Sequence, residues 1–205
     1  QTKSLVHSWR SSQILAIDYI NNKLAGVSKS GDIVIWSIPD GKEGLQKNIS
    51  DVPLTCVAWI DSVFLAVGSE NGDVMKVNSI TGDIVSRMSN RGAITALTKG
   101  QDNNLVTGNA IGVISVYDAR DMRLHYTTKG HKGWIRGIKF SDNGQYFLTV
   151  SDDGHYRKWK SGTEIVSIEN RSLGNWILCG DFTNSPGQKF DIKAFGKRNG
   201  RVIIN

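Results

Sequence analysis

The chain has 205 residues, of which 22 are glycine and three are proline, and it carries a formal net charge of +6. It is long enough for one domain with a substantial core, and no apolar run reaches the roughly 18 residues that a membrane-spanning helix needs. The two cysteines, Cys56 and Cys179, have no metal-type spacing and are too few for a disulfide framework. We therefore expect an intracellular protein, cytoplasmic or nuclear, and the start at Gln1 suggests a processed chain or a piece of a longer one.

A glycine followed by a short β-prone run recurs five times. The glycines are Gly31, Gly72, Gly112, Gly154 and Gly200, which lie 41, 40, 42 and 46 residues apart. A period of about 40–45 residues is typical of four-stranded propeller blades. Short β-rich runs broken by Gly, Asn and Asp predict antiparallel strands joined by hairpins, and no helical periodicity competes with them.

A second series of short apolar runs lies in phase upstream of these glycines. The third residue of each run is small: Ala16, Cys56, Ala96, Gly137 and Cys179. The innermost strands of a propeller converge on a central channel, where only small side chains fit. We therefore interpret both cysteines as space-filling residues rather than reactive ones.

The fourth repeat resembles the WD40 family in detail. It opens with Gly130 and His131, its second and third strands meet at a turn that ends in Gly154, and its third strand contains Trp159. The resemblance implies a buried hydrogen-bonded tetrad that satisfies polar groups and fixes the blade geometry. By offset from the tryptophan, the residues of this structural tetrad are His131, Ser151, Asp153 and Trp159.

The resemblance and the period together predict an all-β, WD40-like β-propeller with five repeats of about 40 residues in a single domain, residues 1–205. The repeats are expected near residues 11–50, 51–90, 91–130, 131–170 and 171–205, with an N-terminal strand at residues 3–9. Two architectures remain open. Either the N-terminal strand completes the last repeat and closes a five-bladed ring, or the chain is part of a larger propeller, usually seven-bladed in this family.

One face of the predicted propeller is a candidate binding surface. The residues directly before the inner strands are Gln13, Pro53, Ala93, Trp134 and Trp176, all in the same register. Tryptophan and arginine are enriched at binding hot spots, and basic residues lie nearby. The expected protein-binding residues are Trp134, Trp176, Arg10, Arg91, Lys132, Arg136 and Arg171. The alternative is that each tryptophan packs flat against its own blade.

Catalytic motifs for nucleophilic, metal-dependent or phosphate chemistry do not occur in the sequence. We expect no enzyme, no cofactor and no small-molecule substrate, although Asp18 and Asp181 on equivalent inner strands leave a glycosidase-type alternative open. The WD40 resemblance implies a non-catalytic scaffold that holds the partners of a multi-subunit protein complex, without membrane insertion. The alternative is a subunit of an RNA–protein particle that contacts RNA through its basic and aromatic residues.

Overall fold

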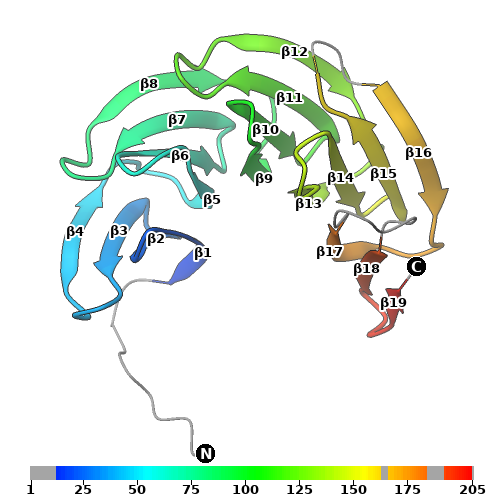
Figure 1. Ribbon diagram of the computed structural model, residues 1–205, viewed down its shortest axis with the longest axis horizontal. Coiled ribbons are helices and arrows are strands. Elements are labelled where there is room, and N and C mark those ends of the chain that lie inside the picture. Colours follow the sequence, from blue (N-terminus) through cyan, green and yellow to red (C-terminus); the bar gives the residue numbers. More distant parts are fainter. Residues whose placement is uncertain (1–12, 163–165, 184–191, 205) are drawn as a thin grey trace, which may run out of the picture.

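The computed structural model describes residues 13–162, 166–183 and 192–204, and these residues form strands, turns and loops without a helix. Five antiparallel sheets follow one another along the chain and lie side by side in an arc (Figure 1). Four of the sheets have four strands and the last has three. The predicted all-β, propeller-like architecture is thereby confirmed.

Each sheet is called a blade below and is numbered in chain order. Blade 1 contains β1 (Ile14–Ile20), β2 (Lys23–Ser28), β3 (Asp32–Ser37) and β4 (Glu43–Asn48). Blade 2 contains β5 (Leu54–Trp59), β6 (Phe64–Ser69), β7 (Asp73–Asn78) and β8 (Ile84–Ser89). Blade 3 contains β9 (Ile94–Lys99), β10 (Asn104–Asn109), β11 (Val113–Asp118) and β12 (Leu124–Lys129). Blade 4 contains β13 (Ile135–Phe140), β14 (Tyr146–Ser151), β15 (His155–Lys160) and β16 (Val166–Ser172). Blade 5 contains β17 (Ile177–Thr183), β18 (Ile192–Lys197) and β19 (Val202–Ile204).

The arc is open within the described residues. In Figure 1, β1 of blade 1 and β17 of blade 5 stand at opposite ends of the arc, and none of the described strand pairs joins these two blades. The strand predicted at residues 3–9 lies outside the described residues. The structure therefore shows five propeller blades in sequence without closure among the described strands.

The repeated glycines have a physical reason. All five sit in the turn between the second and third strands of a blade with positive φ values, from 77° at Gly200 to 95° at Gly72. A Cβ atom at Gly112 would lie 2.1 Å from the carbonyl oxygen of His131, which belongs to the loop that leads to the next blade. Only glycine combines this backbone conformation with so close an approach of another chain segment, which explains why the period is readable in the sequence.

Two threonine hydroxyls link the inner strands of blades 2, 3 and 4. Each inner strand shifts register at its second residue, as between Leu54 and Cys56 of β5. In blades 2 and 3 this residue is a threonine that reaches the next blade: Thr55 Oγ1 donates to the carbonyl of Ile94 at 2.5 Å, and Thr95 Oγ1 donates to that of Ile135 at 2.6 Å. The two bonds connect blade 2 to blade 3 and blade 3 to blade 4 in the same way.

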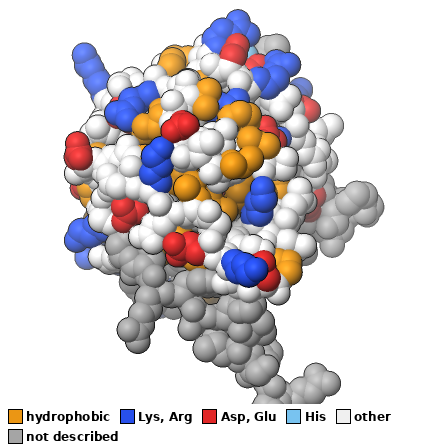
Figure 2. All heavy atoms as spheres, turned by 90° about the vertical axis from the view of Figure 1, so that its left-hand side faces the viewer, with side chains coloured by type: hydrophobic (Ala, Val, Ile, Leu, Met, Phe, Trp, Pro, Cys, Tyr) orange, Lys and Arg blue, Asp and Glu red, His pale blue; other side chains and the backbone are white. Residues whose placement is uncertain are grey.

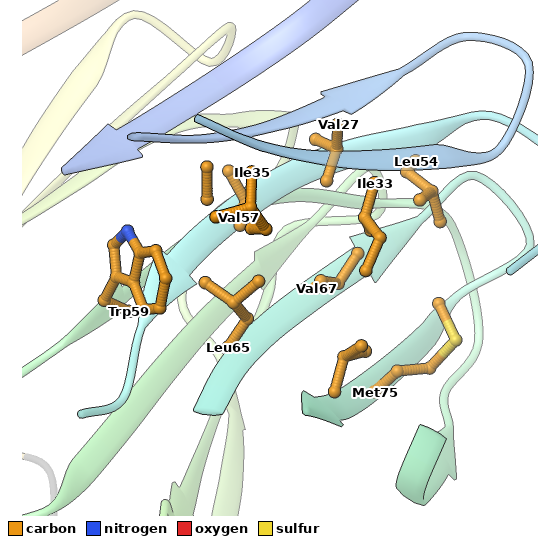
Figure 3. Close-up of a cluster of buried hydrophobic side chains, with 11 residues drawn as sticks. Val27, Ile33, Ile35, Leu54, Val57, Trp59, Leu65, Val67 and Met75 are labelled. Carbon is orange, nitrogen blue, oxygen red and sulfur yellow. The ribbon is translucent and has the colours of Figure 1, made fainter. Parts of the chain in front are cut away.

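Apolar side chains fill the space between blades. Figure 3 shows the cluster between blades 1 and 2, where Val27, Ile33 and Ile35 pack with residues of β5 and β6 that include Val57 and Trp59. The side chains come from both facing sheets, as alternation along paired strands requires. Blade-to-blade burial is thus the main core of the fold.

The two cysteines differ in their environment. Cys56 is buried, and this burial raises the pKa of its thiol to about 12, as expected of a space-filling residue. Cys179 of β17 is exposed, so the expectation of a buried position is wrong for this residue. The physical reason is its place in blade 5, whose outer surface no further described blade covers.

The outer surface of blade 1 is exposed for the same reason. Ile17 and Tyr19 of β1 are 61% and 55% exposed, whereas Val57 and Trp59 at the equivalent positions of β5 are 7% and 4% exposed.

Hydrophobic side chains also gather in the middle of the side of the molecule that carries β4, with charged residues around them (Figure 2). None of the described elements is a helix able to cross a membrane.

Candidate interaction surface and the polar network of blade 4

The residue before each inner strand holds the same position in all five blades. Its carbonyl accepts a hydrogen bond from a backbone N–H in the turn between the second and third strands. The pairs are Gln13 with Lys29 (2.9 Å), Pro53 with Glu70 (2.9 Å), Ala93 with Ala110 (2.9 Å), Trp134 with Asp152 (3.0 Å) and Trp176 with Arg198 (3.1 Å). These loops and turns lie at the same ends of the strands, and we call the surface they form the loop face.

Trp134 lies on the loop face of blade 4 and is 47% exposed. The guanidinium carbon of Arg136 is 4.6 Å from the centre of its ring, within the range of a cation–π contact. The same guanidinium donates to both carboxylate oxygens of Asp152, from Nε at 2.9 Å and from Nη2 at 2.6 Å. The tryptophan, the arginine and the aspartate thus form one contact unit, in which the arginine charge is already balanced.

Trp176 occupies the equivalent place in blade 5 and is 40% exposed. Here the guanidinium carbon of Arg198 lies 4.1 Å from the ring centre. This arginine comes from the turn between β18 and β19, at the position that Asp152 occupies in blade 4. Blade 5 therefore repeats the tryptophan–arginine contact, but its arginine comes from a turn rather than from the inner strand, and the charge balance differs.

The two loop-face tryptophans do not behave as core residues. Trp36, Trp59 and Trp159 are between 4% and 5% exposed, about a tenth of the exposure of Trp134 or Trp176. The packing alternative, in which each tryptophan lies flat on its own blade, explains only the ring surface that the arginine covers. Nearly half of each side chain is left open to a partner.

The other predicted binding residues are spread over the loop face. Arg91 and Lys132 are exposed in the loops before β9 and β13. Arg171 is near the end of β16 and is also exposed, with its Nε 3.2 Å from Glu169. Arg10 lies outside the described residues. The structure brings Arg136 into contact with a tryptophan but shows no such contact for Lys132 or Arg171.

Beneath this surface, blade 4 contains a buried chain of hydrogen bonds. Trp159 Nε1 donates to Thr149 Oγ1 at 2.9 Å, and Thr149 Oγ1 lies 2.6 Å from His131 Nε2. Nδ1 of His131 lies 3.0 and 3.1 Å from the two carboxylate oxygens of Asp153. Because the carboxylate can only accept, we assign the imidazole proton to Nδ1, with Nε2 accepting from the threonine hydroxyl.

The network corrects one residue of the predicted tetrad. Its hydroxyl belongs to Thr149, whereas Ser151 is buried two residues further on and accepts the backbone N–H of Asp153 at 3.1 Å. Side chains two residues apart lie on the same face of a strand, so both hydroxyls suit the pattern. In the pairing of β14 with β15, Phe147 lies opposite Trp159 and Thr149 lies opposite Arg157, so Thr149 is one diagonal step from the indole and within reach of its Nε1–H, whereas Ser151 lies two residues further along the strand.

The buried position of His131 favours its neutral form. Burial lowers the pKa of His131 to about 4, Asp153 opposes this effect, and Arg157 adds to it. Burial by itself would raise the pKa of Asp153, but the backbone N–H groups of Lys132 and His155, the neighbouring His131 and the Arg157 guanidinium hold it well below its usual range. Arg157 Nη1 lies 3.2 Å from Asp153 Oδ2, a contact that the sequence pattern did not indicate.

The carboxylates of the enzymatic alternative are not brought together. Asp18 lies on β1, where its Oδ2 accepts the backbone N–H of Trp59 at 2.7 Å. Asp181 lies on β17, at the other end of the arc in Figure 1, and is 3.7 Å from Lys139. A pair of carboxylates that acts on one glycosidic bond stands within about 10 Å, so these two residues do not form such a site in the described arc.

Two functional candidates escaped the sequence reasoning. Arg198 lies outside the loops before the inner strands, where the binding residues were predicted, but aligning the turns between the second and third strands of the five blades places it opposite Asp152. Asp152, in the corresponding turn of blade 4, was not among the predicted binding residues. Both residues follow the second strand of their blade, and the backbone N–H of each donates to the carbonyl of the tryptophan before the inner strand. This position in the turn is the signal by which Asp152 and Arg198 could have been found.

Comparisons with known proteins agree with this geometry. Residues 122–160, which contain the whole polar network, match the family model for the WD domain, G-beta repeat. The Shk1 kinase-binding protein 15 of Schizosaccharomyces pombe is 26% identical over 180 residues, which cover 85% of this chain and 51% of that protein. The nuclear distribution protein PAC1 of Ajellomyces capsulatus is 42% identical over 92 residues, which cover 44% of this chain and 20% of that protein.

Solved structures show the same fold. The computationally designed Ika8 protein superposes with a TM-score of 0.78 at 23% identity, over 97% of this chain and 59% of that one. A chain of the mitotic checkpoint complex superposes with a TM-score of 0.79 at 15% identity, over 92% of this chain and 60% of that one. This chain spans about half the length of the fission-yeast relative. The matched segment identifies a WD40 repeat at residues 122–160, and the repeat spacing and the blade sheets show that the chain has a WD40-like β-propeller fold.

Proposed function

We propose that this chain is a non-catalytic scaffold that binds protein partners of a multi-subunit complex on its loop face, with Trp134 and Trp176 as anchors. The observation that carries the proposal is the exposure of two tryptophans, 47% and 40%, at equivalent positions of neighbouring blades. Tryptophan is enriched at binding hot spots because it offers a large, rigid contact area at a small entropic cost.

Neither tryptophan is required by the repeat. Gln13, Pro53 and Ala93 hold the same backbone position in the other blades, with the same hydrogen bond from the second turn. Solvent exposure of a large aromatic side chain, at a place where the fold accepts a small one, is best accounted for by contact with another molecule.

The family supports a protein partner. WD40 proteins act as protein-interaction scaffolds, and one relative is named as a kinase-binding protein. A rigid arc of blades can present several loops in fixed geometry. The proposal includes an intracellular location, and neither the comparisons nor the contacts of the loop face specifically favour the RNA–protein alternative.

The test is affinity purification followed by mass spectrometry, with the parent chain and the double variant Trp134→Ala, Trp176→Ala as baits. The matched control is the double variant Ile80→Ala, Leu124→Ala. Both side chains are apolar and exposed, and both lie just after a third strand, at the end of the blade opposite the loop face: Ile80 in the turn between β7 and β8, and Leu124 at the start of β12. Each preparation is also treated with nuclease. If the tryptophans anchor the interface, the parent and the control should recover the same partners. The tryptophan variant should recover about tenfold less of them, or lose them altogether.

Retention of all partners by the tryptophan variant would contradict the proposal. Loss of the partners from the parent after nuclease treatment would indicate a nucleic-acid bridge and would also contradict it. Circular dichroism and thermal unfolding of each bait show whether a loss of binding reflects a loss of fold.

A further inference from the structure

The loop face differs in charge balance between blades 4 and 5. In blade 4, Asp152 is 11% exposed and engages Arg136, while Asp153 is 6% exposed and engages His131 and Arg157. Both carboxylates are therefore used within the blade. In blade 5 the position of Asp152 is taken by Arg198, which is exposed.

In blade 4, the arginine that contacts a tryptophan also binds a carboxylate. The guanidinium carbon of Arg136 lies 4.6 Å from the centre of the Trp134 ring, and its Nε and Nη2 both donate to the Asp152 carboxylate. Stacking uses the face of a guanidinium and leaves its in-plane N–H groups for a carboxylate, so the two contacts do not compete.

Blade 5 has the first two members of this unit and lacks the third. The Arg198 guanidinium lies 4.1 Å from the ring centre of Trp176, and among the described residues no carboxylate lies within ion-pair distance of it. Lys132, exposed in the loop before β13, has no carboxylate side chain at that distance within the described ranges either, and Lys197 Nζ donates to the carbonyl of Leu173. The positive charge on this part of the loop face is not balanced by described carboxylates.

We infer that the Trp176–Arg198 pair receives an acidic side chain of a partner protein, an aspartate or glutamate beside an apolar residue, in the arrangement that Trp134, Arg136 and Asp152 show within blade 4. This inference rests on the proposed function and names the chemistry of its partner. The partner carboxylate accepts hydrogen bonds from the in-plane N–H groups of Arg198, while the apolar residue beside it covers the exposed surface of Trp176. Complementary charge of this kind sets the specificity and the association rate of a complex.

The test begins with a random peptide library displayed on phage and selected on the folded chain at about 0.15 M salt, near physiological ionic strength. Selected peptides are expected to contain about threefold more Asp and Glu than the unselected library, consistent with electrostatic complementarity. A synthetic copy of one selected peptide is then compared by fluorescence anisotropy with its amide counterpart, in which Asn and Gln replace Asp and Glu. The acidic peptide should bind about tenfold more tightly, the strength of one good charge-assisted contact.

Two variants locate the contact. Arg198→Gln should reduce the affinity for the acidic peptide by about tenfold and leave the amide peptide unchanged. Arg198→Lys keeps the charge but loses the fork and should recover only part of the affinity. Arg123→Gln is the matched control, because Arg123 lies in the turn before β12, away from the loop face, and it should have no effect.

Several results would overturn the inference. They are selected peptides without an acidic excess, equal binding of the acidic and amide peptides, no effect of Arg198→Gln, an absence of any selected peptide, or tighter Arg198-dependent binding of a single-stranded RNA pool. The inference and the proposed function fail in different ways. Neutral peptides that the Trp134→Ala, Trp176→Ala variant no longer binds would refute the acidic partner alone, whereas peptides that the variant binds as well as the parent would refute the tryptophan anchors.

Discussion

The indole Nε1–H of Trp159 donates to the hydroxyl of Thr149 at 2.9 Å, from one strand of blade 4 to its neighbour. The hydroxyl in turn lies 2.6 Å from His131 Nε2, so a single oxygen accepts one hydrogen bond and donates the next. The donor-to-acceptor direction of this series of hydrogen bonds, from the Trp159 indole to the Asp153 carboxylate, is therefore set by the Thr149 hydroxyl. Every side chain in it is buried or nearly buried, so no water is needed to satisfy it.

The first prediction concerns this hydroxyl. Thr149→Val keeps the shape of the side chain but leaves the Trp159 N–H without its acceptor and the imidazole without its donor. We expect the free energy of unfolding to fall by about 2–3 kcal/mol, the cost of unsatisfied buried polar groups. Ser151→Ala, the matched variant, removes one acceptor for a backbone N–H and should cost about 1 kcal/mol. Urea unfolding measures both, and an equal or larger loss for Ser151→Ala would show that the network does not depend on Thr149.

The second prediction concerns acid. His131 has a folded pKa of about 4, below the value of 6.5 that is usual for the unfolded chain, so the unfolded state binds more protons between these limits. The free energy of unfolding should therefore fall as the pH falls through this window, by about 2 kcal/mol between pH 7 and pH 5. The lowered pKa of Asp153 acts only below its ordinary value of 3.8, outside this range.

The control for the acid prediction is His131→Gln, which cannot take up a proton. Its stability should be lower at neutral pH, but the part of the pH dependence that His131 supplies should be lost. Urea unfolding at several pH values between 5 and 7 gives both slopes. A parent chain whose stability does not change over this range would contradict a buried neutral imidazole.

The third prediction separates the exposed tryptophans from the buried ones. Trp134→Ala and Trp176→Ala should each lower the free energy of unfolding by less than about 1.5 kcal/mol, because much of the side chain is already in water. Trp159→Ala should cost about 3–5 kcal/mol, since it empties a core position and removes a donor from the network. Thermal and urea unfolding test this contrast. A loss of similar size for all three would mean that the loop-face tryptophans are packing residues after all.

The fourth prediction concerns the contact between blades 4 and 5. Lys193 Nζ lies 2.5 Å from Glu169 Oε2, and Tyr156 donates to Oε1 of the same carboxylate at 2.5 Å. Glu169→Gln keeps the shape but leaves a nearly buried ammonium beside a neutral amide, and it should cost about 2 kcal/mol. Asp83→Asn, which breaks the exposed pair with Lys47, should cause no measurable change. Equal effects in urea unfolding would show that the blade 4–5 contact does not rely on this charge.

The fifth prediction concerns the outer surface of blade 1. Ile17→Lys should change the free energy of unfolding by less than about 0.5 kcal/mol in the isolated chain, because its side chain is exposed. Val57→Lys, at the equivalent position of blade 2, should cost about 3 kcal/mol or more, since it places a charge between two packed sheets. A large loss for Ile17→Lys would reveal a cover over β1 in solution.

Much of the fold was readable because its signals are local. Each repeated glycine marks a turn with a positive φ, and at Gly31, Gly72 and Gly112 a side chain would also strike a backbone carbonyl, so the period appears directly in the sequence. The small residues of the inner strands and the positions of Trp134 and Trp176 follow from the same register. Alternation along a strand decides which side chains share a face, and counting residues is enough to find it.

The remaining features depend on contacts between segments that are distant along the chain. Counting could not choose between Thr149 and Ser151, because both lie on the same face of β14, and only the pairing with β15 places one of them beside Trp159. The same holds for Cys179, whose exposure depends on what covers blade 5, and for Arg198, which approaches Trp176 only after two strands have paired. The sequence by itself determined the repeat, the strands and their register, because these depend on neighbours within a blade. Only the tertiary structure decided the hydrogen-bond partners, the burial and the charge balance of the loop face, because these depend on how blades and strands pack against one another.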